Sequence, residues 1–274
     1  MIGIDFGTLS ARGVLVDPAG KQIARCERPY ASSITTLPDG GCVMNDPQDW
    51  LDAATQIIDN LASRAHRVQG VGVAFTSCTV LPVDAHGTPV CSLLRGEATP
   101  TTRPHAFPKL WKHHSMAVND AADALTMRIK TEPFMHAYGG RVGLEWFHPK
   151  LLEVYTADRD VFRMTAHFLE AGDWLVWRLC APGAPLMRST CNACYKGLWD
   201  AVSGRYFVSA DALRRVGNAD AESLAKMLPT KAAFVPPGTK AGAYNGIPVG
   251  VCMIDAHAAA LYMTNGQPNV LVRS

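Results

Sequence analysis

The sequence predicts an α/β protein built on a mixed sheet, and three observations support this prediction. The chain opens with three short apolar segments that are separated by tight turns. An amphipathic helix follows, and behind it comes a nearly continuous apolar run at 68–82. Antiparallel strands, a crossover helix and a strand covered on both faces together make a mixed sheet with helices packed on it.

The three opening segments are expected as strands at 2–6, 11–17 and 22–30. Residues 7–10 and 18–20 separate them and consist mainly of turn-forming types such as Gly, Ser and Pro. Because two tight connections in a row leave no room for a crossover, the strands are expected to form an antiparallel meander.

A helix is expected to start at Asp46 and Pro47, since Asp followed by Pro at the first helical position is a common start signal. Asp49 lies in the first turn, where the helix dipole favours a negative charge. The apolar residues behind this start recur at helical spacing: Trp50, Ala53, Ala54, Ile57, Ile58, Leu61, Ala62 and Ala65. The run at 68–82 then fits a single buried strand.

From about residue 96 the chain is expected to be mainly helical. The segment 99–108 holds three prolines and is typical of a linker. Helices are expected at 109–115, 121–128, 149–155, 160–180 in one or two pieces, 210–216 and 221–228. A strand at 247–254, a helix at 256–263 and a strand at 269–274 follow. The predicted domains are the first part of a core at 1–98, a helical insertion at 99–240, expected to bind the ligand, and at 241–274 a return to the core and the expected start of a second domain that is missing.

Composition and charge exclude several classes of protein. The 274 residues are 48% hydrophobic and 18% charged, which is ordinary for a packed chain and excludes a disordered, collagen-like or coiled-coil protein. The net charge is +2 with both signs scattered, so neither nucleic acid nor a membrane is an expected partner. The N-terminal MIGIDFG lacks the features of a signal peptide, and a cytoplasmic location is expected.

Eight cysteines lie mostly within apolar segments, which favours reduced, buried thiols over a disulfide framework. Cys191 and Cys194 form a C-x-x-C pair. A zinc site would need a second pair or a histidine at a matching spacing, and that segment of the sequence has neither. Two interpretations stay open: metal or redox chemistry, or two small core residues.

The sequence holds no P-loop, Rossmann or G-x-S-x-G motif. The stretch IDFGTLSAR at 4–12 crosses the first predicted hairpin instead. Its backbone N–H groups and the hydroxyls of Thr8 and Ser10 can converge on a phosphate, while Gly7 permits the turn and Asp5 can hold the water shell of a Mg²⁺ ion. A plain hairpin turn is the alternative.

Asp255 is the second candidate for chemistry. It follows an apolar strand and heads a helix, which would fix its carboxylate at a sheet edge. There it can accept the proton of a substrate hydroxyl that attacks a phosphoryl group. A helix N-cap is the alternative role.

Seven stretches of the chain resemble the FGGY family of carbohydrate kinases, and within it the ribulokinases. They are DFGTLSAR (5–12), FTSCTVLPVD (75–84), PHAFPKLWKHH (104–114), YGGRVGLEWFHPKLL (138–152), FLEAGDWLVWRL (168–179), CNACYKGLW (191–199) and IDAHA (254–258). The resemblance covers essentially the whole chain. It implies the actin, Hsp70 and sugar-kinase fold, a ribonuclease H-like mixed sheet, with a helical sugar-binding insertion.

The resemblance also implies a role for each candidate residue. ATP phosphates and Mg²⁺ would face Asp5, Gly7, Thr8 and Ser10; the sugar would contact Ser77, Trp111 and Lys196; and Asp255 would be the general base. A Trp face can stack on the C–H side of a sugar, and a Lys supplies a charged donor to its oxygens. Without the resemblance, a core tryptophan and a solvated lysine are the expected roles.

The implied function is that of the N-terminal, sugar-binding domain of an ATP-dependent ribulokinase, which phosphorylates the 5-hydroxyl of L-ribulose. D-ribulose or another ketopentose is an alternative substrate, and the resemblance leaves a homodimer open. Family members are about twice as long, so a second ATP-binding domain is expected to be missing and the chain alone to be inactive. Ala74 also departs from the family, where ribulokinases usually carry an aspartate.

Overall fold

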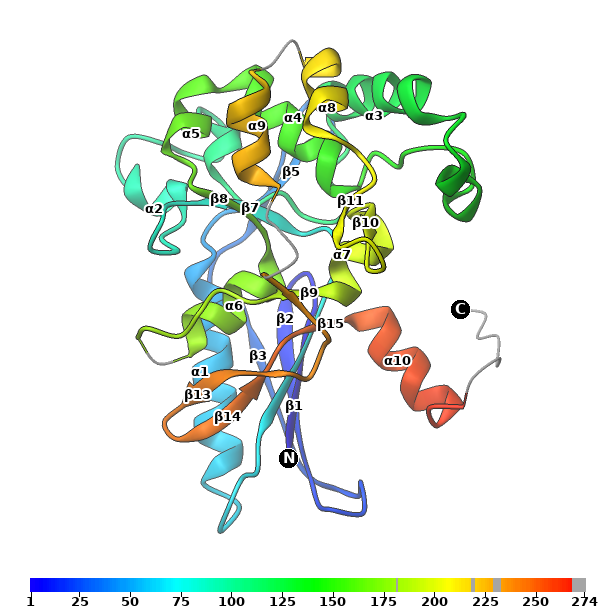
Figure 1. Cartoon of the computed structure of the whole chain (residues 1–274). Helices are drawn as coiled ribbons and strands as arrows, with labels where there is room; N and C mark the ends of the chain where they lie inside the picture. The colour runs from blue at the N-terminus through cyan, green and yellow to red at the C-terminus, as the bar shows by residue number, and fades with distance from the viewer. Residues whose placement is uncertain (181, 218–219, 229–232, 268–274) are drawn as a thin grey trace.

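The structure is a computed structural model that describes residues 1–180, 182–217, 220–228 and 233–267. A sheet region and a mainly helical region lie one above the other (Figure 1). The central sheet contains β1 (Ile2–Phe6), β2 (Ser10–Val16), β3 (Gln22–Pro29), β6 (Val71–Phe75), β13 (Lys240–Tyr244), β14 (Ile247–Gly250) and β15 (Met253–Ile254). Its strand order is β13-β14-β6-β1-β2-β3, with β15 also paired to β6.

The predicted mixed sheet is confirmed, since β1 runs antiparallel to β2 and parallel to β6. Ile2, Ile4 and Phe6 alternate along β1 as buried residues and share a hydrophobic cluster with the apolar face of α1 (Gln48–Ala62). The helix packs very close to β2: a Cβ atom added at Gly13 would lie 2.2 Å from Cγ2 of Ile57. Only glycine at this position permits that approach.

The expectation of one strand at 68–82 is wrong. β6 ends at Phe75, and β7 (Val80–Val83) starts after a loop at 76–79 and pairs with β8 (His167–Glu170) in a different sheet. Periodicity could not reveal the break because every residue from 77 to 83 is buried.

The helical region contains the remaining helices together with short two-stranded sheets. The helices are α2 (Val90–Leu93), η1 (Pro104–Ala106), α3 (Met116–Ile129), η2 (Pro133–Tyr138), α4 (Phe147–Ala157), α5 (Arg159–Met164), α6 (Ala171–Leu179), α7 (Thr190–Lys196), α8 (Ala210–Gly217) and α9 (Ala221–Met227). The short strands are β4 (Ile34–Thr36), β5 (Cys42–Met44), β9 (Arg188–Ser189), β10 (Trp199–Asp200), β11 (Arg205–Tyr206) and β12 (Phe234–Val235). The helices expected at 121–128, 149–155, 210–216 and 221–228 are confirmed with shifted ends.

One helix prediction is wrong, and a second, that of a helix in one or two pieces at 160–180, is confirmed as two helices but missed the strand between them. Lys109 is at the start of the helix expected at 109–115. Its backbone N–H and carbonyl are hydrogen-bonded to Val80 in an antiparallel bridge, so they are not available for helical hydrogen bonds. The segment 160–180 contains β8 between α5 and α6, because Leu169 is placed opposite Leu81 in a buried pair. A strand of four residues is too short to be separated from buried helix by its pattern alone.

The last described elements return to the central sheet. The strand expected at 247–254 is divided into β14 and β15, and β13 forms a hairpin with β14. Asn245 and Gly246 make the turn with φ of 47° and 80°, the left-handed values that suit an Asn-Gly hairpin. The predicted helix that follows is α10 (Asp255–Thr264), which projects away from the body (Figure 1). The strand expected at 269–274 lies outside the described residues.

All eight cysteines are free thiols, as the sequence predicts. Cys191 and Cys194 are half-buried and therefore are not the core residues that one interpretation expected. The Sγ atom of Cys191 lies 3.0 Å from Nδ1 of His257. Across the described ranges, no three His, Cys, Asp or Glu side chains gather as a metal site would require. In the same ranges, every helix is too short or too polar to span a bilayer.

A buried ionic cluster lies where the helical region meets β5 and β7. The Nζ atom of Lys109 is 2.8 Å from a carboxylate oxygen of Glu153, and Nε2 of His113 is 3.0 Å from the same oxygen. Ser115 also donates to Glu153. Burial alone would raise the pKa of Glu153, but the charge of Lys109 and the bond from His113 hold it well below its ordinary value. The cluster is therefore a charged carboxylate fully enclosed by its partners.

Glu153→Gln should lower the free energy of unfolding by about 3–5 kcal/mol, because it leaves the buried charge of Lys109 without its negatively charged partner. Urea unfolding followed by circular dichroism at pH 7 measures this. Glu153 contributes stability above its ordinary pKa of 4.5, and the contribution is lost as the pH falls below that value. The difference between parent and variant should therefore shrink in acid.

Glu222→Gln is the matched control, since Glu222 is 80% exposed and pairs with Lys226 only at the surface. It should change stability by less than about 0.5 kcal/mol. Equal losses in the two variants would contradict the role given to the buried cluster.

Candidate functional site

Residues from both ends of the chain meet in one pocket at the edge of the central sheet. Strands β1, β6 and β15 are parallel, so their carboxyl ends lie at the same edge. The chain segments that leave these ends line a cavity of about 390 Å³ together with residues of the helical region. Its lining residues are Gly7, Thr8, Thr76, Ser77, Trp111, Tyr195, Lys196, Ile254, Asp255 and Ala256.

The bend after β1 is fixed by hydrogen bonds on both sides. The Gly7 N–H donates to the Ser10 carbonyl at 3.0 Å, and the Tyr30 hydroxyl donates to the Gly7 carbonyl at 3.0 Å. Thr8 Oγ1 accepts a hydrogen bond of 3.2 Å from Trp111 Nε1, which joins the bend to the helical region. Ser10 points elsewhere, because its hydroxyl donates to Glu27 at 2.8 Å.

Asp255 is the first residue of α10 rather than its N-cap, which is Ile254. Its carboxylate accepts a bond of 2.7 Å from the Ala256 N–H, and this orients it at the pocket. A second cavity of about 470 Å³ adjoins, and Asp5, Gly7, Ala74 and Asp255 are among its lining residues. The two aspartates therefore border the same space.

The two carboxylates also affect each other electrostatically. Partial burial and then the negative charge of Asp255 raise the pKa of Asp5, while the charge of Arg12 lowers it. Two neighbouring carboxylates repel each other when both are ionised, which disfavours the doubly charged state. A divalent cation relieves that repulsion, and Mg²⁺ binds through few carboxylates while keeping its waters. The side chains at this position therefore fit a hydrated Mg²⁺ ion.

On the other side of the pocket lie Ser77, Trp111 and Lys196, which are well separated in the sequence. Ser77 is buried, whereas the Trp111 ring is 39% exposed and is available to a ligand. Lys196 ends α7, and its Nζ donates to Glu145 at 2.7 Å. Burial lowers the pKa of Lys196, but the bond to Glu145 and the charges of Glu145, Cys78 and Tyr195 together outweigh this and the net shift is upward, so the amine stays charged.

Sequence reasoning missed two residues of this site, Thr76 and Tyr195, which line the pocket. It also missed the bond between Glu145 and Lys196. Thr76 and Tyr195 are neighbours of the predicted Ser77 and Lys196, so adjacency was a usable signal. No sequence signal connects Glu145 with Lys196, because 51 residues separate them.

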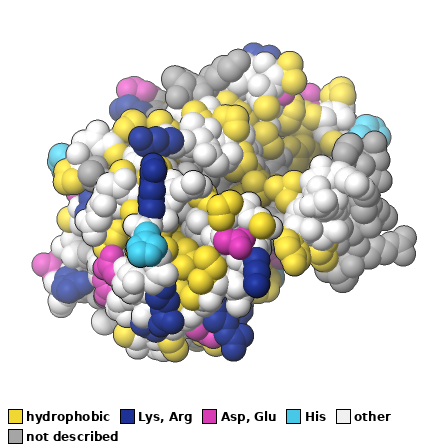
Figure 2. All heavy atoms as spheres, turned by 90° about the horizontal axis from the view of Figure 1, so that it is seen from below, with side chains coloured by type: hydrophobic (Ala, Val, Ile, Leu, Met, Phe, Trp, Pro, Cys, Tyr) yellow, Lys and Arg dark blue, Asp and Glu magenta, His cyan; other side chains and the backbone are white. Residues whose placement is uncertain are grey.

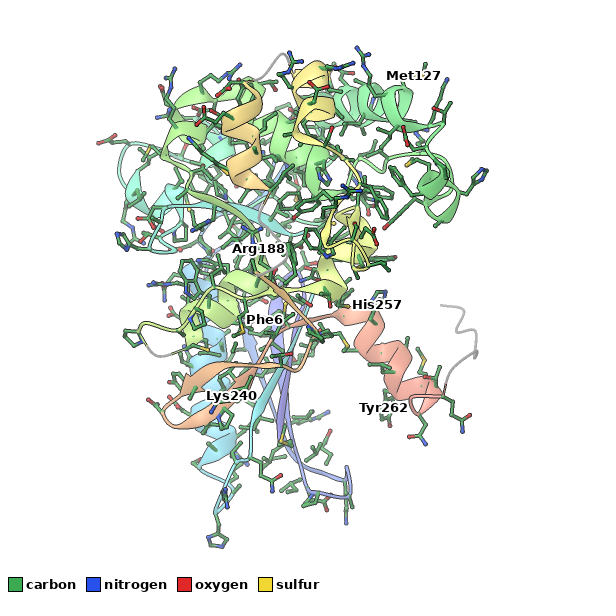
Figure 3. All side chains as sticks on the ribbon, in the orientation of Figure 1. Phe6, Met127, Arg188, Lys240, His257 and Tyr262 are labelled. Carbon is green, nitrogen blue, oxygen red and sulfur yellow. The ribbon has the colours of Figure 1, made fainter. Side chains whose placement is uncertain are left out.

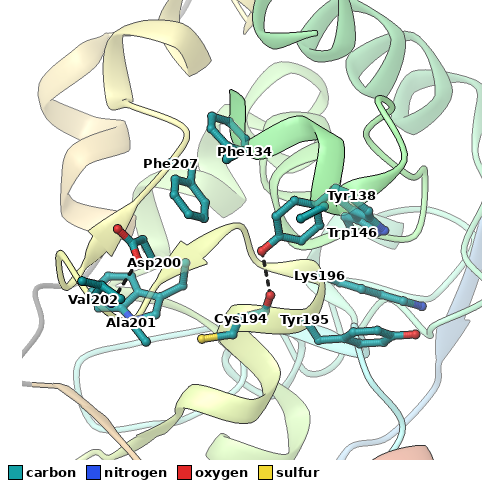
Figure 4. A pocket seen from close by; sticks show the side chains of 12 residues that line it. Phe134, Tyr138, Trp146, Cys194, Tyr195, Lys196, Asp200, Ala201, Val202 and Phe207 are labelled. Carbon is teal, nitrogen blue, oxygen red and sulfur yellow. Dashed lines mark hydrogen bonds between the residues drawn. The ribbon is translucent and has the colours of Figure 1, made fainter. Parts of the chain in front are cut away.

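A larger cavity of about 690 Å³ lies next to the pocket in the helical region (Figure 4). Phe134 and Phe207 stack there with ring centroids 4.4 Å apart, and Tyr138 donates to the Cys194 carbonyl at 2.8 Å. Tyr195 and Lys196 line both cavities. Half of the twelve residues that line the larger cavity are aromatic, and neither Asp5 nor Asp255 is among them.

Comparison with known proteins gives a consistent result. Residues 1–261 match the family described as the FGGY family of carbohydrate kinases, N-terminal domain. The chain is 34% identical to the ribulokinase of Shouchella clausii, over 94% of this chain and 48% of that protein. It is 33% identical to the ribulokinase of Geobacillus thermodenitrificans, over 99% of this chain and 50% of that protein. The chain thus spans about half the length of these curated relatives.

Solved structures share the fold at lower sequence identity. The xylulose kinase of Rhodospirillum rubrum superposes with a TM-score of 0.74 at 21% identity, over 97% of this chain and 51% of that one. The glycerol kinase of Plasmodium falciparum gives a TM-score of 0.67 at 13% identity, over 95% and 49%. These neighbours are sugar and glycerol kinases, and the predicted actin-like sugar-kinase fold is confirmed.

Asp255→Asn should lower the pKa of Asp5, because it removes the neighbouring negative charge. Arg12→Gln should raise it, because it removes the nearby positive charge that favours the carboxylate. NMR titration of the carboxyl carbon of Asp5 measures both shifts. If the titration of Asp5 were the same in the parent and in Asp255→Asn, the two carboxylates would not share a pocket.

Proposed function

The chain belongs to the FGGY family of carbohydrate kinases as an N-terminal domain most like that of ribulokinase, and we propose that it binds the sugar for an ATP-dependent ribulokinase. The observation that carries this proposal is the single pocket that Asp255 lines together with Gly7 and Thr8 of the bend and the side chains of Trp111 and Lys196. The proposed reaction is transfer of the γ-phosphoryl group to the 5-hydroxyl of L-ribulose.

The sugar is proposed to bind on the side of the pocket formed by the helical region. The Trp111 face stacks on the C–H side of the ketose, and the Ser77 hydroxyl and the Lys196 amine bond its oxygens. Lys196 has three N–H donors and uses one for Glu145, so others are free for the sugar. Asp255 then accepts the proton of the attacking hydroxyl.

The phosphates of ATP are proposed to bind at the bend after β1. The Gly7 and Thr8 backbone and the Thr8 hydroxyl bond the phosphate oxygens. Asp5 holds the water shell of Mg²⁺, which when bound neutralises the phosphate charge. Ser10 belongs to this group only if its hydroxyl leaves Glu27, so we give it a smaller part than Thr8.

The proposed domain division remains a core at 1–98, a sugar-binding insertion at 99–240 and a return to the core at 241–274. Two separate hydrophobic clusters support it, one around the central sheet and one in the helical region. Helix α6 is an exception to a strictly sequential division, since Trp174 and Leu175 pack in the cluster of the sheet.

Isothermal titration calorimetry with L-ribulose tests the sugar site. Trp111→Ala and Ser77→Ala should each weaken binding by about three- to tenfold, as expected for the loss of one stacking contact or one hydrogen bond. Met127→Ala is a control on the surface, because Met127 is 65% exposed on α3 and does not line the pocket. Tighter binding of D-ribulose than of L-ribulose would replace the proposed substrate with its alternative.

Asp255→Asn should lower turnover by about 10²–10⁴-fold while leaving sugar affinity within a few-fold, because the amide cannot accept the proton. A coupled phosphotransfer assay on the protein expressed from its complete reading frame measures this. An unchanged rate would remove Asp255 from the mechanism.

We propose further that the 274-residue chain alone binds the sugar without turning it over. The supporting observation is α10, none of whose ten described residues is buried, so Asp255 lies on an open wall of the pocket. Phosphoryl transfer requires both reactants to be held in an enclosed site. Turnover by this chain at a rate typical of kinases, about 1–100 per second, would overturn this proposal.

A further inference from the structure

The loop at 76–79 lines the pocket and contains a strained residue. Thr76 and Ser77 face the cavity, while Cys78 has a φ of +60° and is completely buried. A residue with a Cβ atom rarely adopts this left-handed conformation, which is strained. Other groups must therefore hold the Cys78 backbone in place.

Two buried ionisable side chains bind the backbone of Cys78 from opposite elements. Glu170, at the end of β8, accepts the Cys78 N–H at 2.9 Å. Lys150, on α4, donates to the Cys78 carbonyl at 2.6 Å. Lys150 is 0% exposed and Glu170 is 7% exposed. The N–H and the carbonyl of Cys78 are thus both hydrogen-bonded. Their partners are side chains that lie 72 and 92 residues away in the sequence.

Lys150 also binds the segment that carries Trp111. Its Nζ donates to the Leu110 carbonyl at 2.8 Å, one residue before the tryptophan. The Trp111 N–H donates to Thr79 Oγ1 at 3.2 Å, so the two segments are joined a second time. One ammonium group therefore fixes the relative position of the loop with Ser77 and the segment with Trp111.

This use of a buried lysine is unusual among the described residues. Lys109, the neighbouring buried lysine, forms an ion pair with Glu153, whereas Lys150 has no carboxylate within 4.0 Å in the described part of the chain. Burial lowers the pKa of Lys150 to about 8, although the nearby Cys78, Glu170 and Glu145 favour its charge. A buried charge with only carbonyl partners is costly, so it points to a requirement beyond stability.

We propose that Lys150 and Glu170 are positioning residues of the sugar pocket: they hold the Cys78 peptide and the Leu110 carbonyl so that Ser77 and Trp111 face the same ligand. This inference rests on the proposed function, because it takes Ser77 and Trp111 as sugar contacts. Neither Lys150 nor Glu170 needs to touch the sugar.

Lys150→Met should raise the Kd for L-ribulose by at least about tenfold in calorimetry, because it leaves the Cys78 carbonyl unpaired and removes one of the two hydrogen bonds to the Leu110 carbonyl, whose other donor is the His113 N–H. Glu170→Leu should do the same by freeing the Cys78 N–H. Glu170→Gln should recover most of that loss, because the amide has nearly the shape of the carboxyl group and keeps an oxygen that can accept the Cys78 N–H.

Glu153→Gln is the matched control, since Glu153 lies one turn along α4 and is equally buried, but it reaches the segment with Trp111 only through the side chains of Lys109 and His113 and bonds neither the Cys78 peptide nor the Leu110 carbonyl. It should lower stability yet leave the Kd for L-ribulose within about twofold of the parent. Amide hydrogen exchange of the peptide covering 76–79 should be faster in Lys150→Met than in Glu153→Gln. If Lys150→Met does not fold, the comparison of Glu170→Leu with Glu170→Gln decides the matter.

The outcomes separate this inference from the proposed function. If Ser77→Ala and Trp111→Ala bind L-ribulose as the parent does, the proposed sugar site is wrong and the inference fails with it. If those variants lose affinity while folded Lys150→Met and Glu170→Leu bind as the parent does, the positioning role alone is overturned. Loss of affinity in Glu153→Gln equal to that in Lys150→Met would also overturn it, because general destabilisation would then explain both.

Discussion

The parallel pairing of β6 with β1 on one side and with β15 on the other determines the rest of the arrangement. Asp5 and Met253 are both opposite Ala74 in register, so the ends of three strands that are far apart in the sequence reach the sheet edge together. The bend at Gly7, the loop at 76–79 and the start of α10 follow directly from those ends. Seen from below, hydrophobic side chains line the hollow between this sheet and α10 (Figure 2).

The helical region contributes the other half of the pocket through polar contacts with buried groups. Lys109 and Lys150 lie at the junction, and each joins segments that the hydrophobic clusters alone would leave free to shift. Figure 3 shows how densely side chains fill the space around Arg188 and Phe6, between the two regions, compared with those around Tyr262 on α10. Apolar packing holds the sheet region and the helical region in contact, and hydrogen bonds and ion pairs fix how the two regions are aligned.

Whether an element could be predicted from the sequence depended on its length and on how far away in the sequence its pairing partner lies. The meander at the N-terminus and α1 were predictable because alternation and helical spacing persist over many residues. The strands β7 and β8 were not, because each is a buried segment of four residues whose partner lies far away in the sequence. Among the candidate residues, seven line the two adjoining cavities, whereas Ser10 turns to Glu27. Trp111 and Lys196 were predicted from the resemblance to the family. Their hydrogen bonds to Thr8 and Glu145 could not be predicted, because they depend on the tertiary structure alone.

The contact between Gly13 and Ile57 limits how the sheet can be strengthened by design. Replacing a strand glycine with alanine commonly restricts the unfolded chain and raises stability, but at this position the new methyl group would push α1 off the strand. Gly72, two strands away on β6, has open space around its missing Cβ. Two glycines of one sheet thus respond in opposite ways to the same alteration, and an engineer choosing by amino-acid type alone would not distinguish them.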